Sequence, residues 1–416
     1  MKQILLLGPT PPPYGGITSL IGDLVPYLAK NSEIDIVTPS HDEKKNKFRF
    51  LEPTKTHPDS KVKTHYFNYR AITIRWFFPL CAQLLRSLLA LVTSERSASI
   101  NLLKTIAIGI CNEYAIERIT RTQGKIYDHV ILFGLNYIGC VPSLRRHVGN
   151  STKITVMIFA EAYKWPDSYL RASVYFSQRF ALVDNIFSSS DYCACSLKKV
   201  LGRDDYVSTI YIGVDTDLFR PVSSDELKNR LNIPPNSKVV LALSRMNEEM
   251  GYDVVLKAAE ELLKANTELY LVMAGARAHY TEKVVEFCSN HERAICQISI
   301  PLEEKVLYYS MADVFLAPTE QTHACMGVSI KEAMACETAI VASRSGGIPE
   351  AIKHRENGCL VGFDGKKTDV GALIDETQFL LDHEEIAAGL AKQARTDAEL
   401  IFSTAAMFRK YDDLLS

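Results

Sequence analysis

The stretch from Thr322 to Glu350, THACMGVSIKEAMACETAIVASRSGGIPE, carries residue types and spacings suited to binding a phosphorylated ligand. Gly327 stands where a helical pattern begins, so backbone N–H groups at that helix start would face an anion. Glu332 lies inside the same pattern, where its carboxylate could accept two hydroxyl hydrogens from a ribose. Taken alone, Glu332 could equally be a solvated helix residue. The prediction of a nucleotide site therefore rests on Glu332 together with its neighbours.

Two further loops carry groups of the same kind. In SRMNEEMGYD, Arg245 follows an apolar run, and arginine is the natural bidentate partner of a diphosphate. In GPTPPPYGGITSL, Gly15 and Gly16 stand between the first apolar run and the first helical pattern. Such a pair serves either a tight turn or the close approach of backbone amides to an anion or sugar, and both interpretations stay open.

The elements that must position these loops follow from an alternation of short β-rich apolar runs with helical patterns along the whole chain. This alternation predicts an α/β fold with parallel sheets covered by helices on both faces. The pattern restarts near residue 212, which predicts two doubly wound domains. Ligands of such sheets bind outside the carboxyl ends of the strands, where the three loops lie. The expected strands are 3–8, 34–39, 129–134, 154–160, 185–190, 239–245, 269–275, 294–300, 314–319 and 339–344.

Other classes of function find little support. The formal net charge of −2 gives no electrostatic reason to expect nucleic acid as a partner. No GxxxxGK[ST], HExxH, GxSxG or GxGxxG pattern occurs. His323 beside Cys325 is too isolated to predict a metal site. The ten cysteines form no CxxC pair, which favours reduced thiols and a cytoplasmic location.

One apolar segment, Trp76–Val92, requires a separate interpretation. It is short and contains Pro79, Gln83 and Arg86, so a helix that spans a membrane is not expected. It could be a core helix of the first domain. It could also be a helix on a membrane surface, within an arginine-bearing region from residue 74 to 121.

An ordered series of motifs resembles the retaining GT-B glycosyltransferases of family 4, the group 1 nucleotide-sugar-dependent enzymes. The resemblance covers most of the chain and is strongest over residues 180–363. The motifs are VDNIFSSSDYCACSLKKVLG, IYIGVDTDLFRP, LALSRMNEEMGYDVVLKAAEEL, YLVMAGA, YYSMADVFLAPT and GVSIKEAMACETAIVASRSGGIPEAIKHRENGCLV.

This resemblance implies two facing Rossmann-like domains. Residues 1–211 would form the acceptor-side domain, joined by a returning C-terminal helix at about 398–416. Residues 212–397 would bind the nucleotide-sugar donor. The resemblance also implies an enzyme that needs no metal and no cofactor beyond its nucleotide-sugar substrate.

Site residues follow from the resemblance position by position. Arg245 would contact the donor diphosphate, Glu332 would hold the ribose, and Gly16, next to Gly15, would close over the phosphates. Backbone amides of a further trio would face donor phosphate or sugar: Met326, Gly327 and Val328. Departure of a nucleoside diphosphate needs fixed donors of this kind, each contributing about 3 kcal/mol in the transition state.

The chain departs from the family pattern at three positions. The first of the family's paired glutamates falls on Ala324. The resemblance implies that position 324 and Arg245 are the catalytic positions. The family's diphosphate lysine falls on Met250, and its acceptor-side histidine is absent, with Glu161 nearest in place. Arg245 is then the main cation at the phosphates, although either Lys257 or Lys331 could supply another.

Three interpretations of Ala324 stay open: an active enzyme of a divergent branch, a catalytically impaired Glu-to-Ala variant, and a non-catalytic nucleotide-sugar-binding subunit or pseudoenzyme. The resemblance implies a glycan or lipid-linked acceptor in cell-surface polysaccharide biosynthesis, meaning capsule, O-antigen or exopolysaccharide. It also implies work at the inner face of the plasma membrane, with peripheral membrane association. A nucleotide-sugar epimerase on the same fold is disfavoured because GGIPEAIKHRENGCLV matches transferases better.

Overall fold

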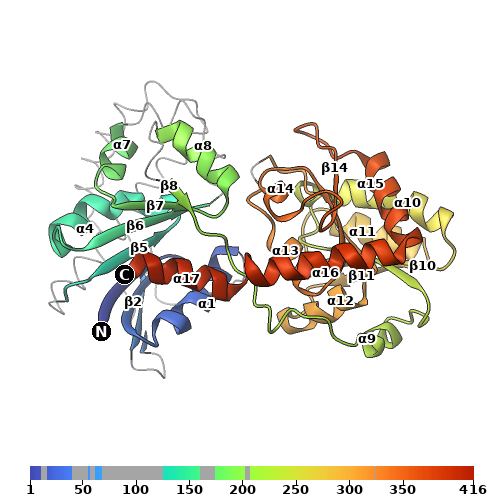
Figure 1. Ribbon diagram of the computed structural model, residues 1–416, viewed down its shortest axis with the longest axis horizontal. Helices are drawn as coiled ribbons and strands as arrows, with labels where there is room; N and C mark the ends of the chain where they lie inside the picture. The colour runs from blue at the N-terminus through green and yellow to red at the C-terminus, as the bar shows by residue number, and fades with distance from the viewer. Residues whose placement is uncertain are drawn as a thin grey trace. The chain divides into compact units, whose positions relative to one another are not determined.

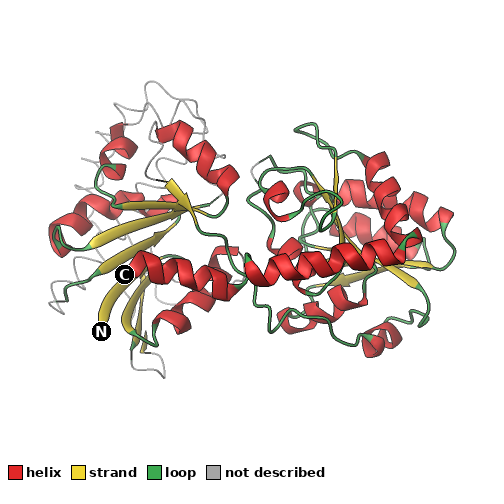
Figure 2. Cartoon of the chain, viewed as in Figure 1, coloured by secondary structure: helices red, strands yellow, loops and turns green. Residues whose placement is uncertain are grey.

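The computed structural model describes residues 1–10, 16–39, 55–56, 61–67, 125–159, 174–201, 207–322 and 324–416. The chain divides into two compact units, Met1–Ile210 together with Tyr411–Ser416, and Tyr211–Lys410. Each unit is an α/β structure with helices around one sheet (Figure 2). The predicted α/β fold class with two parallel-sheet domains is therefore confirmed.

The first unit contains a sheet of order β3-β4-β2-β1-β5-β6-β7-β8. All neighbouring strands are parallel except β3, which is antiparallel to β4. The strands are β1 Lys2–Leu7, β2 Ser32–Pro39, β3 Lys55–Thr56, β4 Val62–Phe67, β5 His129–Phe133, β6 Lys153–Ile158, β7 Asn185–Ser188 and β8 Val207–Thr209.

The helices of the first unit follow its strands in the chain (Figure 1). Strands β1 and β5 are almost entirely buried because helices cover both faces, which explains their unbroken apolar runs. The described helices are α1 Gly16–Leu28, the 3-10 helix η2 Leu135–Cys140, α4 Val141–Val148, α7 Val174–Phe180 and α8 Asp191–Leu201.

The second unit contains an all-parallel sheet of order β11-β10-β9-β12-β13-β14. Its strands are β9 Lys238–Leu243, β10 Leu269–Gly275, β11 Ala294–Ile298, β12 Val314–Ala317, β13 Ala339–Ser343 and β14 Cys359–Val361. Its helices are α9 Asp225–Arg230, η3 Glu248–Met250, α10 Tyr252–Ala265, α11 Thr281–Ser289, η4 Leu302–Glu304, α12 Lys305–Met311, α13 Val328–Ala335, α14 Ile348–Ala351, α15 Val370–Asp382 and α16 Glu384–Leu400.

Alternate residues of the central strand β9 pack into two separate cores. Val239 and Leu241 join side chains of α12 and α13 on one face. Val240 and Ala242 join side chains of α10 and α15 on the other (Figure 1). Because successive strand residues point to opposite faces, a run without polar residues is what a sheet covered on both sides requires.

Each sheet has one point at which the strand order reverses. In the first unit it lies between β1 and β5, and in the second between β9 and β12. The loops that leave two such strands diverge to opposite faces of the sheet, which opens a crevice at their carboxyl ends. Arg245 follows β9 and Ala324 follows β12, so both belong to the crevice loops of the second unit.

The last helix, α17 Thr404–Leu415, passes from the second unit into the first, where its final residues pack. The Nζ of Lys2 donates a hydrogen bond to the carbonyl of Leu415. The hydroxyl of Tyr27 in α1 donates to Asp412 at 2.5 Å. Helix α16 ends at Leu400 and α17 begins at Thr404. The sequence led us to expect one returning helix at about 398–416.

The strands predicted from the sequence are all present, with ends that differ by a few residues. Strands β3, β4, β8 and β14 were not predicted. The β4 sequence VKTHYF alternates with polar residues, and β8 and β14 are only three residues long. Among the described residues, no helix is both long and apolar enough to cross a membrane. Trp76–Val92 and the region from 74 to 121 lie outside the described residues.

Close contacts between backbones require glycine at two crevice positions. A Cβ on Gly251, which has φ +76, would stand 1.9 Å from the carbonyl oxygen of Pro318. A Cβ on Gly347 would stand 1.7 Å from the carbonyl oxygen of Cys325. Real Cβ atoms do not approach so closely, so any other residue forces the two loops apart. The Gly-Gly pair in SRSGG therefore holds the segment before α13 in place.

We predict that Gly347→Ala lowers the free energy of unfolding by more than about 1 kcal/mol, because its Cβ meets backbone that cannot rotate away. Gly389 in α16 is the matched control, since a Cβ added there would have no atom within 4 Å. Gly389→Ala should raise the free energy of unfolding by about 0.5–1 kcal/mol, because glycine weakens a helix interior. Denaturant unfolding of both variants tests this pair, and an unchanged midpoint for Gly347→Ala would contradict the close packing.

Candidate functional site

The candidate site lies at the carboxyl ends of β9 and β12, where the strand order of the second sheet reverses. The loop after β9 carries Arg245 and Met250, and the loop after β12 leads through Ala324 into α13. Topology therefore brings together loops that are about 80 residues apart in sequence. A backbone hydrogen bond of 3.0 Å from Glu320 to the carbonyl of Glu249 joins the two loops directly.

Arg245 is exposed, and its guanidinium makes no hydrogen bond or ion pair with any described residue. The backbone around it is held firmly. Asn247 donates to the carbonyl of Arg245 at 2.8 Å, and Met246 donates to the carbonyl of Ala276 at 3.0 Å. A fixed backbone that carries an exposed planar cation is a suitable arrangement for bidentate binding of a phosphate group.

Met250 carries no charge at the position where the resemblance implies a second cation. Met250 ends the short helix η3, and its backbone N–H donates to the side chain of Asn247 at 3.0 Å. Lys257 is exposed on α10. Lys331 is buried, donates to the carbonyl of Ile212, and has a pKa lowered by burial to about 8. Lys331 is therefore committed to the backbone and Lys257 lies within α10, which leaves Arg245 as the cation of this set that stands in a crevice loop.

Helix α13 begins at Val328, directly after Gly327, as the sequence led us to expect. Gly327 is exposed and has φ +75, a conformation that few other residues adopt. Met326 before it is buried. The first backbone N–H groups of α13 have no acceptor within the helix, so this end of α13 can donate to an anion.

Glu332 is almost fully buried in α13, and two partners hold its carboxylate. The Nζ of Lys305 lies 3.0 and 3.2 Å from its two oxygens, and the hydroxyl of Tyr309 donates to Oε2 at 2.7 Å. Burial, and then the charge of Glu332, raise the pKa of Tyr309 well above its usual range, so this hydroxyl remains a donor. The expectation of a carboxylate free to accept two ribose hydroxyls therefore needs revision.

Lys305 and Tyr309 are site residues that sequence reasoning missed. Both lie in α12, and the only signal was the motif YYSMADVFLAPT, which includes Tyr309 but not Lys305. A carboxylate has about four acceptor positions, and these partners occupy three of them. The remaining position is on Oε1, next to the partly exposed Lys305.

Ala324 is also buried, and its backbone is tightly held. Its carbonyl accepts a hydrogen bond of 2.8 Å from Gly347, and its N–H donates to the carbonyl of Gln321. Glu320 is the carboxylate that precedes it most closely in this loop, but Lys367 and the backbone of Thr368 hold both of its oxygens. The described part of the loop therefore contains no free carboxylate in place of the missing one.

The remaining predicted residues either belong to the first unit or lie outside the described residues. Gly16 is exposed at the start of α1, and a Cβ added there would have no described atom within 4 Å. Gly15, Glu161 and His323 lie outside the described residues. Their predicted roles stay predictions.

Comparison with protein families and curated proteins points to one class. Residues 223–397 match the family model described as Glycosyl transferases group 1. D-inositol 3-phosphate glycosyltransferase 2 of Catenulispora acidiphila is 29% identical over 246 residues, 56% of this chain and 57% of that protein. A GDP-mannose-dependent α-(1-6)-phosphatidylinositol monomannoside mannosyltransferase of Mycolicibacterium smegmatis is 31% identical over 191 residues, 44% of this chain and 49% of that protein. The chain spans about half the length of the curated relatives it matches.

Solved structures match over the whole chain. Sucrose-phosphate synthase from Thermosynechococcus elongatus has a TM-score of 0.73 at 17% identity, covering 100% of this chain and 98% of that one. HepE from Anabaena, in complex with UDP and glucose, has a TM-score of 0.69 at 16% identity, covering 100% and 99%. Identities this low bear on the fold alone. Residues 223–397 thus form a glycosyl transferases group 1 domain, in a chain that has the GT-B fold.

Proposed function

We propose that the chain is a glycosyltransferase that moves a sugar from a nucleotide-sugar donor to a glycan or lipid-linked acceptor, with retention at the anomeric carbon. The observation that carries the proposal is the exposed guanidinium of Arg245 at the carboxyl end of β9, within a domain that matches group 1 glycosyl transferases. The mannosyltransferase relative is named for GDP-mannose and the HepE structure contains UDP, so UDP- and GDP-sugars are the first donors to test.

In the proposed reaction the bond between the sugar and the nucleoside diphosphate breaks, and negative charge develops on the departing diphosphate. An acceptor hydroxyl oxygen bonds to the anomeric carbon, and its proton passes to the departing diphosphate. Arg245 and the amides at the start of α13 stabilise that charge as fixed donors. Since these donors already supply positive potential, we propose a reaction without a metal ion or cofactor. Glu332, held by Lys305 and Tyr309, accepts one ribose hydroxyl on Oε1.

We propose further that the acceptor belongs to cell-surface polysaccharide biosynthesis and that the chain associates peripherally with the inner face of the plasma membrane. The apolar, arginine-bearing region from 74 to 121 motivates this part of the proposal. Liposome flotation with anionic vesicles should recover the protein with the lipid, and recovery should fall as the salt concentration rises. Absence of binding to anionic vesicles at low salt would rule this association out.

A second candidate function follows from Ala324. A chain that lacks the expected carboxylate could bind nucleotide-sugars without turnover, as a non-catalytic subunit or pseudoenzyme, or be a Glu-to-Ala variant of an active enzyme. The specific observation in favour is that Glu320, the preceding carboxylate of the loop, is already paired with Lys367. Turnover of the nucleotide-sugar by the wild-type chain decides between this candidate and the divergent active enzyme.

The role of Arg245 is tested by calorimetry with UDP and GDP. We predict that Arg245→Gln weakens binding of the preferred nucleotide by about ten- to a hundredfold, because it removes a hydrogen-bonding charge from the diphosphate. Lys257→Gln is the matched control, since Lys257 is exposed in the same domain, and it should change affinity by less than about twofold. Equal losses in the two variants would point to general electrostatic attraction in place of a specific contact.

The role of position 324 is tested by turnover. We predict that the wild-type chain releases nucleoside diphosphate in an acceptor-dependent manner and that Ala324→Glu changes the rate by less than about threefold. A missing sugar contact is worth about 2–4 kcal/mol, or about 30- to 1000-fold in rate. An increase of that size in Ala324→Glu would support the impaired variant. Nucleotide binding without turnover in both proteins would support the binding subunit.

A further inference from the structure

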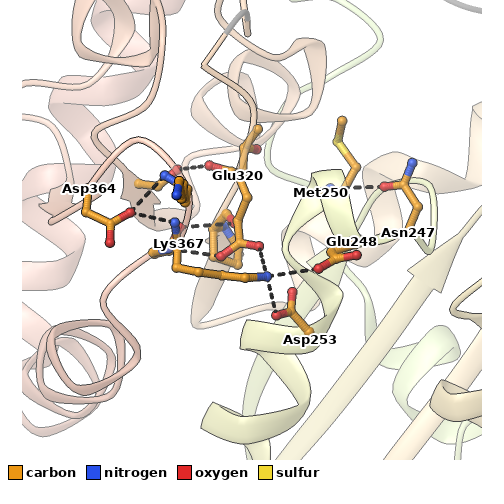
Figure 3. Close-up of polar contacts among 12 residues, drawn as sticks. Asn247, Glu248, Met250, Asp253, Glu320, Asp364 and Lys367 are labelled. Atoms are coloured by element: carbon orange, nitrogen blue, oxygen red, sulfur yellow. Dashed lines mark hydrogen bonds and ion pairs between the residues drawn. The ribbon is translucent and has the colours of Figure 1, made fainter.

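Lys367 lies in a tight turn between β14 and α15. The side chain of Asp364 accepts hydrogen bonds of 2.8 Å from the backbone of Lys366 and 2.7 Å from the backbone of Lys367. The backbone of Asp364 donates in turn to the carbonyl of Lys367 at 3.2 Å. This turn places the lysine side chain over the loops that leave β9 and β12 (Figure 3).

The ammonium of Lys367 lies among three carboxylates from three elements (Figure 3). Its Nζ is 3.0 Å from Glu248 of η3, 2.9 Å from Asp253 of α10 and 2.8 Å from Glu320 after β12. The side chain of Glu320 is only 3% exposed, and its other oxygen accepts a hydrogen bond of 2.9 Å from the backbone of Thr368. Lys367 thus connects both crevice loops to the turn after β14.

The three acids would repel one another without a cation between them. Their oxygens lie within 4.8 Å of one another, a spacing that could suit a metal ion. The ammonium of Lys367 already occupies the place of that cation, so we propose no metal there. Hydrogen bonds, chiefly to Asp253 and Glu320, raise the pKa of Lys367, which keeps it charged over the physiological range.

The loop after β9 is held from two sides. On one side Met246 donates to Ala276 and accepts from Tyr280, at 3.0 Å in each case. On the other side Lys367 holds Glu248, and Glu320 donates through its backbone to Glu249 at 3.0 Å. The guanidinium of Arg245 makes no hydrogen bond or ion pair with the described residues, so its position depends on the backbone of this loop.

We propose that Lys367 is a positioning residue of the nucleotide site. It holds the loop 245–251 against the loop after β12 and thereby keeps Arg245 directed at the diphosphate. Lys367 itself does not contact the nucleotide, because three carboxylates occupy its ammonium. This inference rests on the proposed function, since it gives that site a residue which neither the family motifs nor the spacing of the sequence indicated.

The test measures the affinity for UDP and GDP by calorimetry in single and double variants of the full chain. Lys367→Met should weaken binding of the preferred nucleotide about tenfold, and Lys367→Arg should restore most of the affinity. Lys264→Met is the matched control, because Lys264 is also exposed and pairs with two acids, but both belong to its own helix α10, and it should leave affinity unchanged. In an Arg245→Gln background, Lys367→Met should weaken nucleotide binding by less than threefold, because Lys367 affects binding by positioning Arg245.

Two results would overturn the proposal: affinity within twofold of the wild type in Lys367→Met, or a tenfold loss that persists in the Arg245→Gln background. Hydrogen exchange distinguishes a failure of this inference from a failure of the proposed function. If the wild type binds no nucleotide, the proposed function fails. Faster exchange at amides 246–251 in Lys367→Met, with β10 unchanged, would then still support the positioning role, and unchanged exchange would overturn it.

Discussion

The candidate site depends on contacts in which one backbone lies directly against another. Gly251 packs against the carbonyl of Pro318, and Gly347 packs against the carbonyl of Cys325. These contacts fix the loop after β9 to the loop after β12, and the segment before α13 to the start of α14. No side chain can substitute for them, because the missing Cβ is what permits the approach. The loops that carry the candidate functional groups are thus held by direct backbone contacts.

Four of the described acids beside the crevice have a lysine as partner. Lys305 pairs with Glu332, and Lys367 pairs with Glu320 and two further acids. Unpaired, these carboxylates would oppose a diphosphate by like-charge repulsion. Their pairing leaves the exposed Arg245 to act on an incoming anion. One lysine does not neutralise three acids, so the attraction for an anionic ligand rests on Arg245 and on the amides at the start of α13.

Sequence reasoning succeeded where a local pattern determines the outcome. Unbroken apolar runs predicted the parallel strands, because only strands covered on both faces tolerate them. The start of α13 after Gly327 was also predicted correctly. The partners of Glu332 were not, because Lys305 reaches it across 27 residues of sequence and no local spacing encodes that contact. Lys367 was missed for the same reason, since its three partners belong to elements far from it in the chain.

The departures from the family pattern fall on side chains and spare the backbone. The carbonyl of Ala324 accepts a hydrogen bond from the backbone of Gly347 at 2.8 Å, and the backbone N–H of Met250 donates to the side chain of Asn247 at 3.0 Å. The groups that we propose for the nucleotide, Arg245 and the amides at the start of α13, are thus present, while the carboxylate that the resemblance implies at position 324 is not. Binding of the nucleotide and positioning of the sugar are therefore separable properties of this site. In the proposed function the first uses groups present in the described loops, and the second uses a group other than the side chain at position 324.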